Sequence, residues 1–157
     1  MPDTDPVTPE VIAPPPALYL GTLAAGLVLG VIQPLPVFSA PVLLRGLGIL
    51  ILAVGAIVIR WAFVTMQRTR ANVARGDRPA ALVVRGPFRF SRNPVYVGMT
   101  ALYLGGAFLA NSVWMLFLLV PLLVIMHWGV IVREERFLER QFGDAYLLYK
   151  SVTPRWL

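Results

Sequence analysis

The sequence predicts an all-α integral membrane protein with four transmembrane helices, a cytoplasmic Arg-rich loop and a C-terminal amphipathic helical segment. Apolar side chains make up 57% of the 157 residues and charged side chains only 14%, whereas about 25% of the residues in a soluble domain are charged. A chain of this length has too small an interior to hide so much apolar surface from water. The composition therefore favours a lipid bilayer as solvent and argues against disorder over most of the chain.

Four apolar segments predict the membrane spans, at residues 17–32, 44–66, 95–110 and 113–132. A spanning helix needs about 20 apolar residues, with a range of about 17 to 25. The second and fourth segments have this length, and the first and third reach it through uncharged neighbours. Small residues at Thr22, Gly26 and Gly30 form a stripe on the first helix, which predicts close packing against another helix of this chain or of a second copy.

The remaining residues divide the chain into a lead-in and one domain. Residues 1–16 are rich in proline and are expected to form a disordered lead-in, followed by a single membrane domain over residues 17–157. The first ten residues carry acidic and no basic side chains, the reverse of the positive start of a signal peptide, so a signal peptide is not expected.

The arginines predict the orientation in the membrane. Seven of them lie in residues 67–93 and most of the others follow residue 132, whereas residues 33–41 and 111–112 carry no charge. The positive-inside rule therefore places the Arg-rich loop and both termini in the cytoplasm. Lys150 is the only lysine, and this preference for arginine is typical of a GC-rich bacterial genome. We therefore expect a bacterial inner membrane.

Several kinds of chemistry are excluded by composition. Cysteine is absent and His127 is the only histidine, so the sequence predicts neither a thiolate nucleophile nor a Cys-based or His-cluster metal site. The net charge of +6 does not by itself indicate nucleic acid, because positive charge on a membrane protein more often sets topology. His127 itself is expected to be a packed, hydrogen-bonded residue rather than a catalyst.

The first of two polar stretches, residues 82–98, ends in a helix-start signal. Asn93 is a suitable N-cap residue and Pro94 suits the first helical position. One interpretation is a structural cap with arginines facing lipid headgroups. The other is an anion site, in which free N–H groups of the helix and Arg92 bind a carboxylate or phosphate while Phe88 and Tyr96 offer aromatic surface.

The second polar stretch, residues 133–149, continues the fourth helix beyond the membrane. Apolar side chains recur at helical spacing and predict an amphipathic interfacial helix. Glu134 and Glu135 fall at the membrane boundary, where a carboxylate is costly without a partner. The partner is expected to be either a bound ligand or the arginines of the loop.

Taken in order, these pieces resemble the isoprenylcysteine carboxyl methyltransferase family and the related membrane phospholipid methyltransferases. The resemblance covers about half of the chain, from residue 80 to residue 155. The matching pieces are Leu82-Val83, Gly86-Pro87-Phe88, Arg92-Asn93-Pro94-Val95-Tyr96-Val97-Gly98, Glu134-Glu135, Phe142-Gly143, Tyr146 with Tyr149, and Val152-Thr153-Pro154.

The resemblance implies that residues 80–157 bind S-adenosylmethionine as the methyl donor. The residues that match the family's cofactor contacts are Leu82, Val83, Phe88, Asn93, Pro94, Tyr96, Glu134 and Glu135. By this match the first three line the pocket and the next three meet the amino-acid end or the sulfonium of the cofactor. Glu134 binds a polar group of the cofactor, with Glu135 in support.

The methyl acceptor is the least determined part of the resemblance. Eukaryotic members usually carry histidine where this chain has Asn93, and a substrate-binding arginine where it has Val130. Arg133 and Arg140 are expected to take over the acceptor contact, and no residue is assigned as catalytic. A carboxylate acceptor predicts a nearby arginine and an amine acceptor predicts a nearby carboxylate, and both residue types are present. We expect a lipid or a small hydrophobic molecule that arrives from the bilayer.

The sequence thus predicts an integral-membrane methyltransferase that acts on a lipophilic acceptor among membrane lipids. The alternative is a non-enzymatic four-helix membrane scaffold or assembly partner, whose charged stretches only contact headgroups. An NADPH-dependent reductase ranks last, because the sequence contains no Gly-rich dinucleotide fingerprint.

Overall fold

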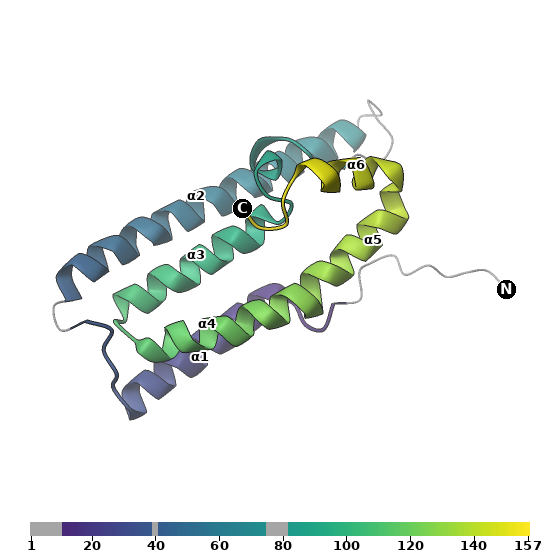
Figure 1. Ribbon diagram of the computed structural model, residues 1–157. Helices are drawn as coiled ribbons and strands as arrows, with labels where there is room; N and C mark the ends of the chain where they lie inside the picture. Colours follow the sequence, from purple (N-terminus) through teal and green to yellow (C-terminus); the bar gives the residue numbers. More distant parts are fainter. Residues whose placement is uncertain (1–10, 39–40, 75–81) are drawn as a thin grey trace.

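The computed structural model describes residues 11–38, 41–74 and 82–157, and these residues form an all-helical bundle (Figure 1). Within these ranges β-type pairing is confined to one isolated bridge between Pro36 and Ser112. The helices are α1 (Pro15–Ile32), α2 (Pro41–Ala74), the 3-10 turn η1 (Gly86–Arg89), α3 (Pro94–Leu109), α4 (Val113–Ile125), the π-helical turn η2 (Met126–Ile131), α5 (Val132–Phe142) and α6 (Asp144–Val152).

All four predicted apolar helices are present, but their lengths differ from the prediction. Within the described residues, three helices are long and apolar enough to cross a membrane, at Pro15–Ile32, Val42–Arg70 and Val113–Phe142. The third predicted span, α3, has only 16 residues, fewer than the roughly 20 that a bilayer needs. The first helix begins at Pro15, two residues before the predicted start at residue 17, because proline is well tolerated in the first helical turn.

Helices α2 and α3 are held together by two reciprocal glycine pairs. A Cβ atom built on Gly48 would lie 2.8 Å from the carbonyl oxygen of Gly105, and one on Gly105 would lie 2.8 Å from that of Gly48. Gly55 and Gly98 repeat the arrangement at 2.8 and 2.9 Å. Because only glycine fits at these contacts, the two backbones approach closely, as helices do in membranes.

Helix α1 packs against α4 through the predicted small-residue stripe. A Cβ atom on Gly26 would lie 2.7 Å from Cγ of Met115, and one on Gly30 would lie 3.3 Å from Oγ of Ser112. The stripe therefore packs within this chain, although the Thr22 hydroxyl donates to the Leu18 carbonyl of its own helix. The buried core between these helices and α3 consists of Tyr19, Tyr103, Ala107, Met115, Leu122, Met126 and Val130.

Helices α4 and α5 form one continuous rod through η2, and α6 folds back from its end. Gly143 ends α5 with a φ of 53°, a left-handed conformation that favours glycine. Asp144 is the first residue of α6 rather than its cap. Large apolar side chains remain exposed along the outside of the bundle, among them Val31 at 82% and Leu43 at 87%. Such an outer surface suits contact with lipid and supports an integral membrane protein.

Candidate functional site

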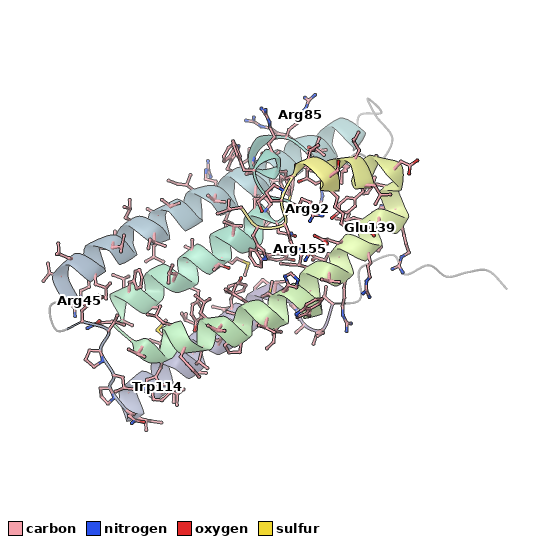
Figure 2. All side chains as sticks on the ribbon, viewed as in Figure 1. Arg45, Arg85, Arg92, Trp114, Glu139 and Arg155 are labelled. Atoms are coloured by element: carbon pink, nitrogen blue, oxygen red, sulfur yellow. The ribbon has the colours of Figure 1, made fainter. Side chains whose placement is uncertain are left out.

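The polar side chains of three segments meet at one end of the bundle. These segments are the approach to α3, the first turn of α5 and the C-terminal residues after α6. Figure 2 shows Arg92 and Arg155 in the space between α3 and α5. Of the two partners expected for the glutamates, a loop arginine is present, because Arg92 pairs with Glu135.

Glu134 is joined to Tyr96 by a side-chain hydrogen bond. The Tyr96 hydroxyl lies 2.7 Å from Oε1 of Glu134, and both side chains are half-buried. The Tyr96 carbonyl accepts a hydrogen bond of 2.8 Å from Thr100, whose hydroxyl lies 2.7 Å from that of Tyr19. This chain of contacts connects α1, α3 and α5 and fixes the Glu134 carboxylate at the edge of the apolar core.

Glu135 has a different environment from its neighbour. Its side chain is buried and lies between two guanidinium groups. Arg155 donates to both carboxylate oxygens, from Nε at 2.9 Å and from a terminal nitrogen at 2.6 Å, and Arg92 lies 3.3 Å from Oε1. A buried carboxylate needs such partners to offset its desolvation. Glu135 thus holds the three segments together, and its carboxylate is occupied by the two arginines rather than open to a ligand.

Arg92 still has unused hydrogen-bonding capacity. Its guanidinium is buried, and within the described part of the chain its Nε has no hydrogen-bond acceptor, while the terminal nitrogen that lies 3.3 Å from Glu135 forms an ion pair without a hydrogen bond. Buried donors without acceptors are uncommon in folded proteins. The site therefore presents a free N–H group beside Glu135.

His127 extends the ionic cluster toward the membrane. Its Nε2 lies 2.9 Å from a terminal nitrogen of Arg155. Because guanidinium only donates, Nε2 must accept, and the neutral ring carries its proton on Nδ1. The contact agrees with the expectation that His127 is a hydrogen-bonded residue.

The C-terminal tail is fastened to the approach to α3. The Arg155 carbonyl accepts hydrogen bonds from the Ser91 hydroxyl at 3.2 Å and from the Asn93 side chain at 3.0 Å. The Arg92 amide donates to the Pro154 carbonyl at 2.9 Å. Asn93 does occupy the N-cap position, but its side chain makes no cap hydrogen bond and instead donates from Nδ2 to the Arg155 carbonyl. The predicted side-chain cap is therefore wrong, whereas Pro94 does begin the helix.

The tyrosines of α6 lie against the same cluster. Burial, reinforced by the nearby Glu135 carboxylate, raises the pKa of Tyr146 to about 12, although Arg92 opposes the shift. Burial also raises the pKa of Tyr149, whose hydroxyl donates to the Phe88 carbonyl at 2.7 Å. The hydrogen bond to Glu135 raises the pKa of Arg155, which keeps this side chain cationic.

The other residues predicted for the cofactor lie around this cluster. Leu82 lines a hollow of about 560 Å³ between the loop and α6, and the lining residues of this hollow include neither Tyr96 nor Glu134. Val83 and the Phe88 side chain are half-buried, and Pro94 is buried at the start of α3. The structure thus brings Asn93, Tyr96 and the two glutamates together but places Leu82 in a neighbouring hollow.

The predicted acceptor arginines lie outside the cluster. Arg133 and Arg140 are both exposed on α5.

A second hollow, of about 570 Å³, lies one helical turn along α3 from Tyr96. It has mostly apolar walls with one imidazole, and its lining residues are Thr100, Val120, Leu123, Val124, His127, Trp128 and Trp156.

Two residues of the site were not singled out from the sequence. Ser91 is buried and accepts a hydrogen bond from the Asn93 amide at 3.1 Å, and Arg155 contacts both Glu135 and His127 in the ionic cluster. The available signal in the sequence was the Thr153-Pro154 pair, which belongs to the resemblance and directly precedes Arg155.

Comparisons with known proteins show which family the chain belongs to. Residues 43–145 match the family model described as phospholipid methyltransferase. An uncharacterised protein from Haemophilus influenzae is 44% identical over 49 residues, which are 31% of this chain and 76% of that relative. No solved structure matches the chain.

Proposed function

Because the chain belongs to the phospholipid methyltransferase family, we propose that it transfers a methyl group from S-adenosylmethionine to a lipophilic acceptor at the membrane surface. The family is one of membrane methyltransferases. The identity of the methyl donor and the class of the acceptor are what we propose. The observation that carries the proposal is the Tyr96–Glu134 hydrogen bond beside the Arg92–Glu135–Arg155 cluster. These contacts gather a carboxylate and guanidinium groups at one end of an apolar bundle.

The residues present fit the polar groups of S-adenosylmethionine. Glu134 receives the Tyr96 hydroxyl on Oε1, and a carboxylate has further lone pairs that can accept from a ribose hydroxyl or an amino group. The buried Nε–H of Arg92 has no acceptor among the described residues, and a guanidinium binds a carboxylate well. The site thus offers an acceptor for the cationic part of the donor and donors for its anionic part.

The chemistry needs positioning more than proton transfer. When bound, S-adenosylmethionine supplies a methyl group on a positively charged sulfur, and transfer depends on alignment and on exclusion of water. In this chain the Glu135–Arg155 pair fixes the tail against α5, and Tyr96 fixes the Glu134 carboxylate. These contacts hold the segments around the site without a cysteine or a free histidine base.

The apolar hollow beside His127 supports a lipophilic acceptor. Its walls come from α3, α4, η2 and Trp156, and the Thr100 hydroxyl in its lining donates a hydrogen bond to the Tyr96 carbonyl. A hydrocarbon chain in this hollow would therefore end close to the Tyr96–Glu134 pair. Arg133 and Arg140 remain proposed contacts for the polar head of the acceptor, from the exposed face of α5.

Binding of the methyl donor by the purified full-length protein tests the proposal. We expect saturable S-adenosylmethionine binding in detergent by calorimetry, and transfer of labelled methyl groups into a lipid extract. Absence of saturable binding by protein whose circular dichroism shows intact helices would instead favour the scaffold function.

The arrangement in the membrane is also proposed. The arginines of residues 67–93 and of the C-terminal segment support a bacterial inner membrane with both termini cytoplasmic. Reporter fusions to the C-terminus should be active only if the reporter works in the cytoplasm, and the opposite pattern would contradict this orientation.

A further inference from the structure

We propose that the end of the bundle far from Glu134 binds the phosphate of an anionic lipid headgroup. This site is independent of the methyltransferase site. Figure 2 shows Arg45 at the start of α2, at the opposite end of the bundle from Arg92 and Arg155. Gly86, beside the methyltransferase site, contacts Thr65 of α2, and 20 residues of helix place Arg45 roughly 30 Å away.

A hollow of about 380 Å³ lies at this end, between the α1–α2 connection and the α3–α4 turn. Its lining combines apolar side chains with one cation and polar turn residues, and consists of Leu27, Gly30, Val31, Pro34, Leu35, Pro36, Arg45, Ala110, Asn111 and Ser112. The mixture of a charged group with apolar walls suits a lipid headgroup and the start of its chains.

Arg45 supplies the charge at this hollow. The sequence contains no Asp or Glu from residue 11 to residue 76 or from residue 78 to residue 133. An arginine in the first turns of a membrane span lies at the depth of lipid phosphates. Because the residues near Arg45 in the sequence and across the bundle are uncharged, we expect the negative charge that pairs with it to come from a lipid headgroup.

Ser112 supplies a hydrogen-bond donor in the same lining. Its side chain is 6% exposed, and its Oγ has no hydrogen-bond partner among the described residues. A buried hydroxyl without a partner is destabilising. Ser112 also precedes the first turn of α4, where the helix dipole favours negative charge. A phosphate oxygen that accepts from Oγ would satisfy both features.

The walls of the hollow are preorganised. The Asn111 side chain accepts from the amides of Val37 and Phe38, both at 3.1 Å, and donates to the Phe38 carbonyl at 2.9 Å. The Val113 amide donates to the Leu35 carbonyl at 3.0 Å. Because these bonds fix the two connections before any ligand arrives, little ordering cost opposes binding.

Native mass spectrometry of the delipidated full-length protein tests this site, with phosphatidylglycerol and phosphatidylcholine as probes. We expect the anionic lipid to bind about tenfold more tightly, because the choline ammonium of phosphatidylcholine offsets the attraction between its phosphate and Arg45. Arg45→Gln should remove the preference, and Ser112→Ala should weaken phosphatidylglycerol binding roughly three- to tenfold. Arg60→Gln is the matched control, because Arg60 is an exposed arginine on the same helix, and it should leave the preference unchanged.

Ser112→Ala separates binding from folding. Without lipid its thermal midpoint should equal or exceed that of the parent, because the substitution removes a buried hydroxyl that has no partner. Equal binding of the two lipids, or equal effects of Arg45→Gln and Arg60→Gln, would overturn the proposal. Inorganic phosphate should bind far more weakly than phosphatidylglycerol, and binding of the free ion as tight as that of the lipid would also overturn it.

Discussion

The Tyr96 hydroxyl donates a hydrogen bond of 2.7 Å to Oε1 of Glu134 and thereby joins the first turn of α3 to the first turn of α5. Its neighbour Glu135 points into an ion cluster instead. The two adjacent glutamates thus differ in role. Glu135 stabilises the junction of three segments, whereas Glu134 keeps lone pairs that can accept hydrogen bonds from a ligand.

Removal of the Tyr96 hydroxyl tests the task of Glu134. Tyr96→Phe should weaken S-adenosylmethionine binding about tenfold, because the carboxylate loses the donor that positions it, and Glu134→Gln should weaken it further. Calorimetric titration measures both effects. Glu139→Gln is the control, since Glu139 lies on the outer part of α5 and pairs with Lys150 of α6. If both site variants bind like the parent while their helical content is unchanged, the assignment of the site is wrong.

Loss of the buried carboxylate should affect folding rather than ligand contact. Glu135→Ala leaves two arginines without their shared partner and should lower the free energy of unfolding by about 3 to 5 kcal/mol. Arg155→Ala should cost less, about 1.5 to 3 kcal/mol, because Arg92 still faces the carboxylate. Denaturation in mixed detergent micelles measures both. A cost below about 1 kcal/mol for Glu135→Ala would mean that the pair behaves like an exposed one.

The tyrosines of α6 predict a loss of stability at high pH. The pKa of Tyr146 rises from 10.0 to about 12 on folding because of burial, so the folded state favours the neutral phenol. Stability should therefore be constant below about pH 10 and should decline between pH 10 and pH 12, as the unfolded chain releases the proton first. Unfolding followed by circular dichroism across this range measures the decline. Tyr146→Phe should make it shallower, and an unchanged slope would contradict the explanation.

The glycine pairs predict opposite effects of the same substitution two residues apart. Gly48→Ala places a methyl group 2.8 Å from the Gly105 carbonyl oxygen and should destabilise the protein by about 1 to 3 kcal/mol. A Cβ atom on Gly46 meets nothing within 4 Å, so Gly46→Ala should be neutral or stabilising by up to about 1 kcal/mol. Thermal midpoints of the two variants in one detergent provide the comparison. Equal shifts would show that the close approach of α2 and α3 does not matter for stability.

Hydropathy predicted the existence of the helices better than their ends. The second apolar segment stops near Met66, but α2 continues to Ala74. An apolar run shows where contact with lipid ends, whereas a helix also continues through polar residues that tolerate its backbone geometry. Helix α3 ends early for a different reason. Asn111 takes a φ of 48° and turns the chain into α4.

The close contact between α2 and α3 was not predicted, although a signal was present. Gly48 and Gly55 are separated by the same interval as Gly98 and Gly105, and residues at this interval share one helix face. Either pair alone is a weak pattern, because the sequence does not say which face meets which helix. The stripe with Gly26 and Gly30 was more evident because its residues are spaced by four.

The convergence of Asn93, Tyr96 and the glutamates was predictable because each belongs to a recognisable motif. Arg155 was not predictable as the partner of Glu135. Its position depends on the sharp turn at Gly143 and on the anchoring of α6 by Tyr149, which bring residues after the helix back to α3. Such a long-range pairing leaves no periodic trace in the sequence.

The π-helical turn Met126–Ile131 sets the rotational phase between α4 and α5. Each residue advances a helix by about 100°, and a π turn holds one residue more than an α turn. Deletion of one residue here would convert the π turn into an α turn and would leave Glu134 and Glu135 facing Tyr96 and Arg92. Deletion of a second residue would turn both glutamates by about 100°, away from these partners. The π turn thus lets the connection between the membrane span and the glutamates lose one residue and no more.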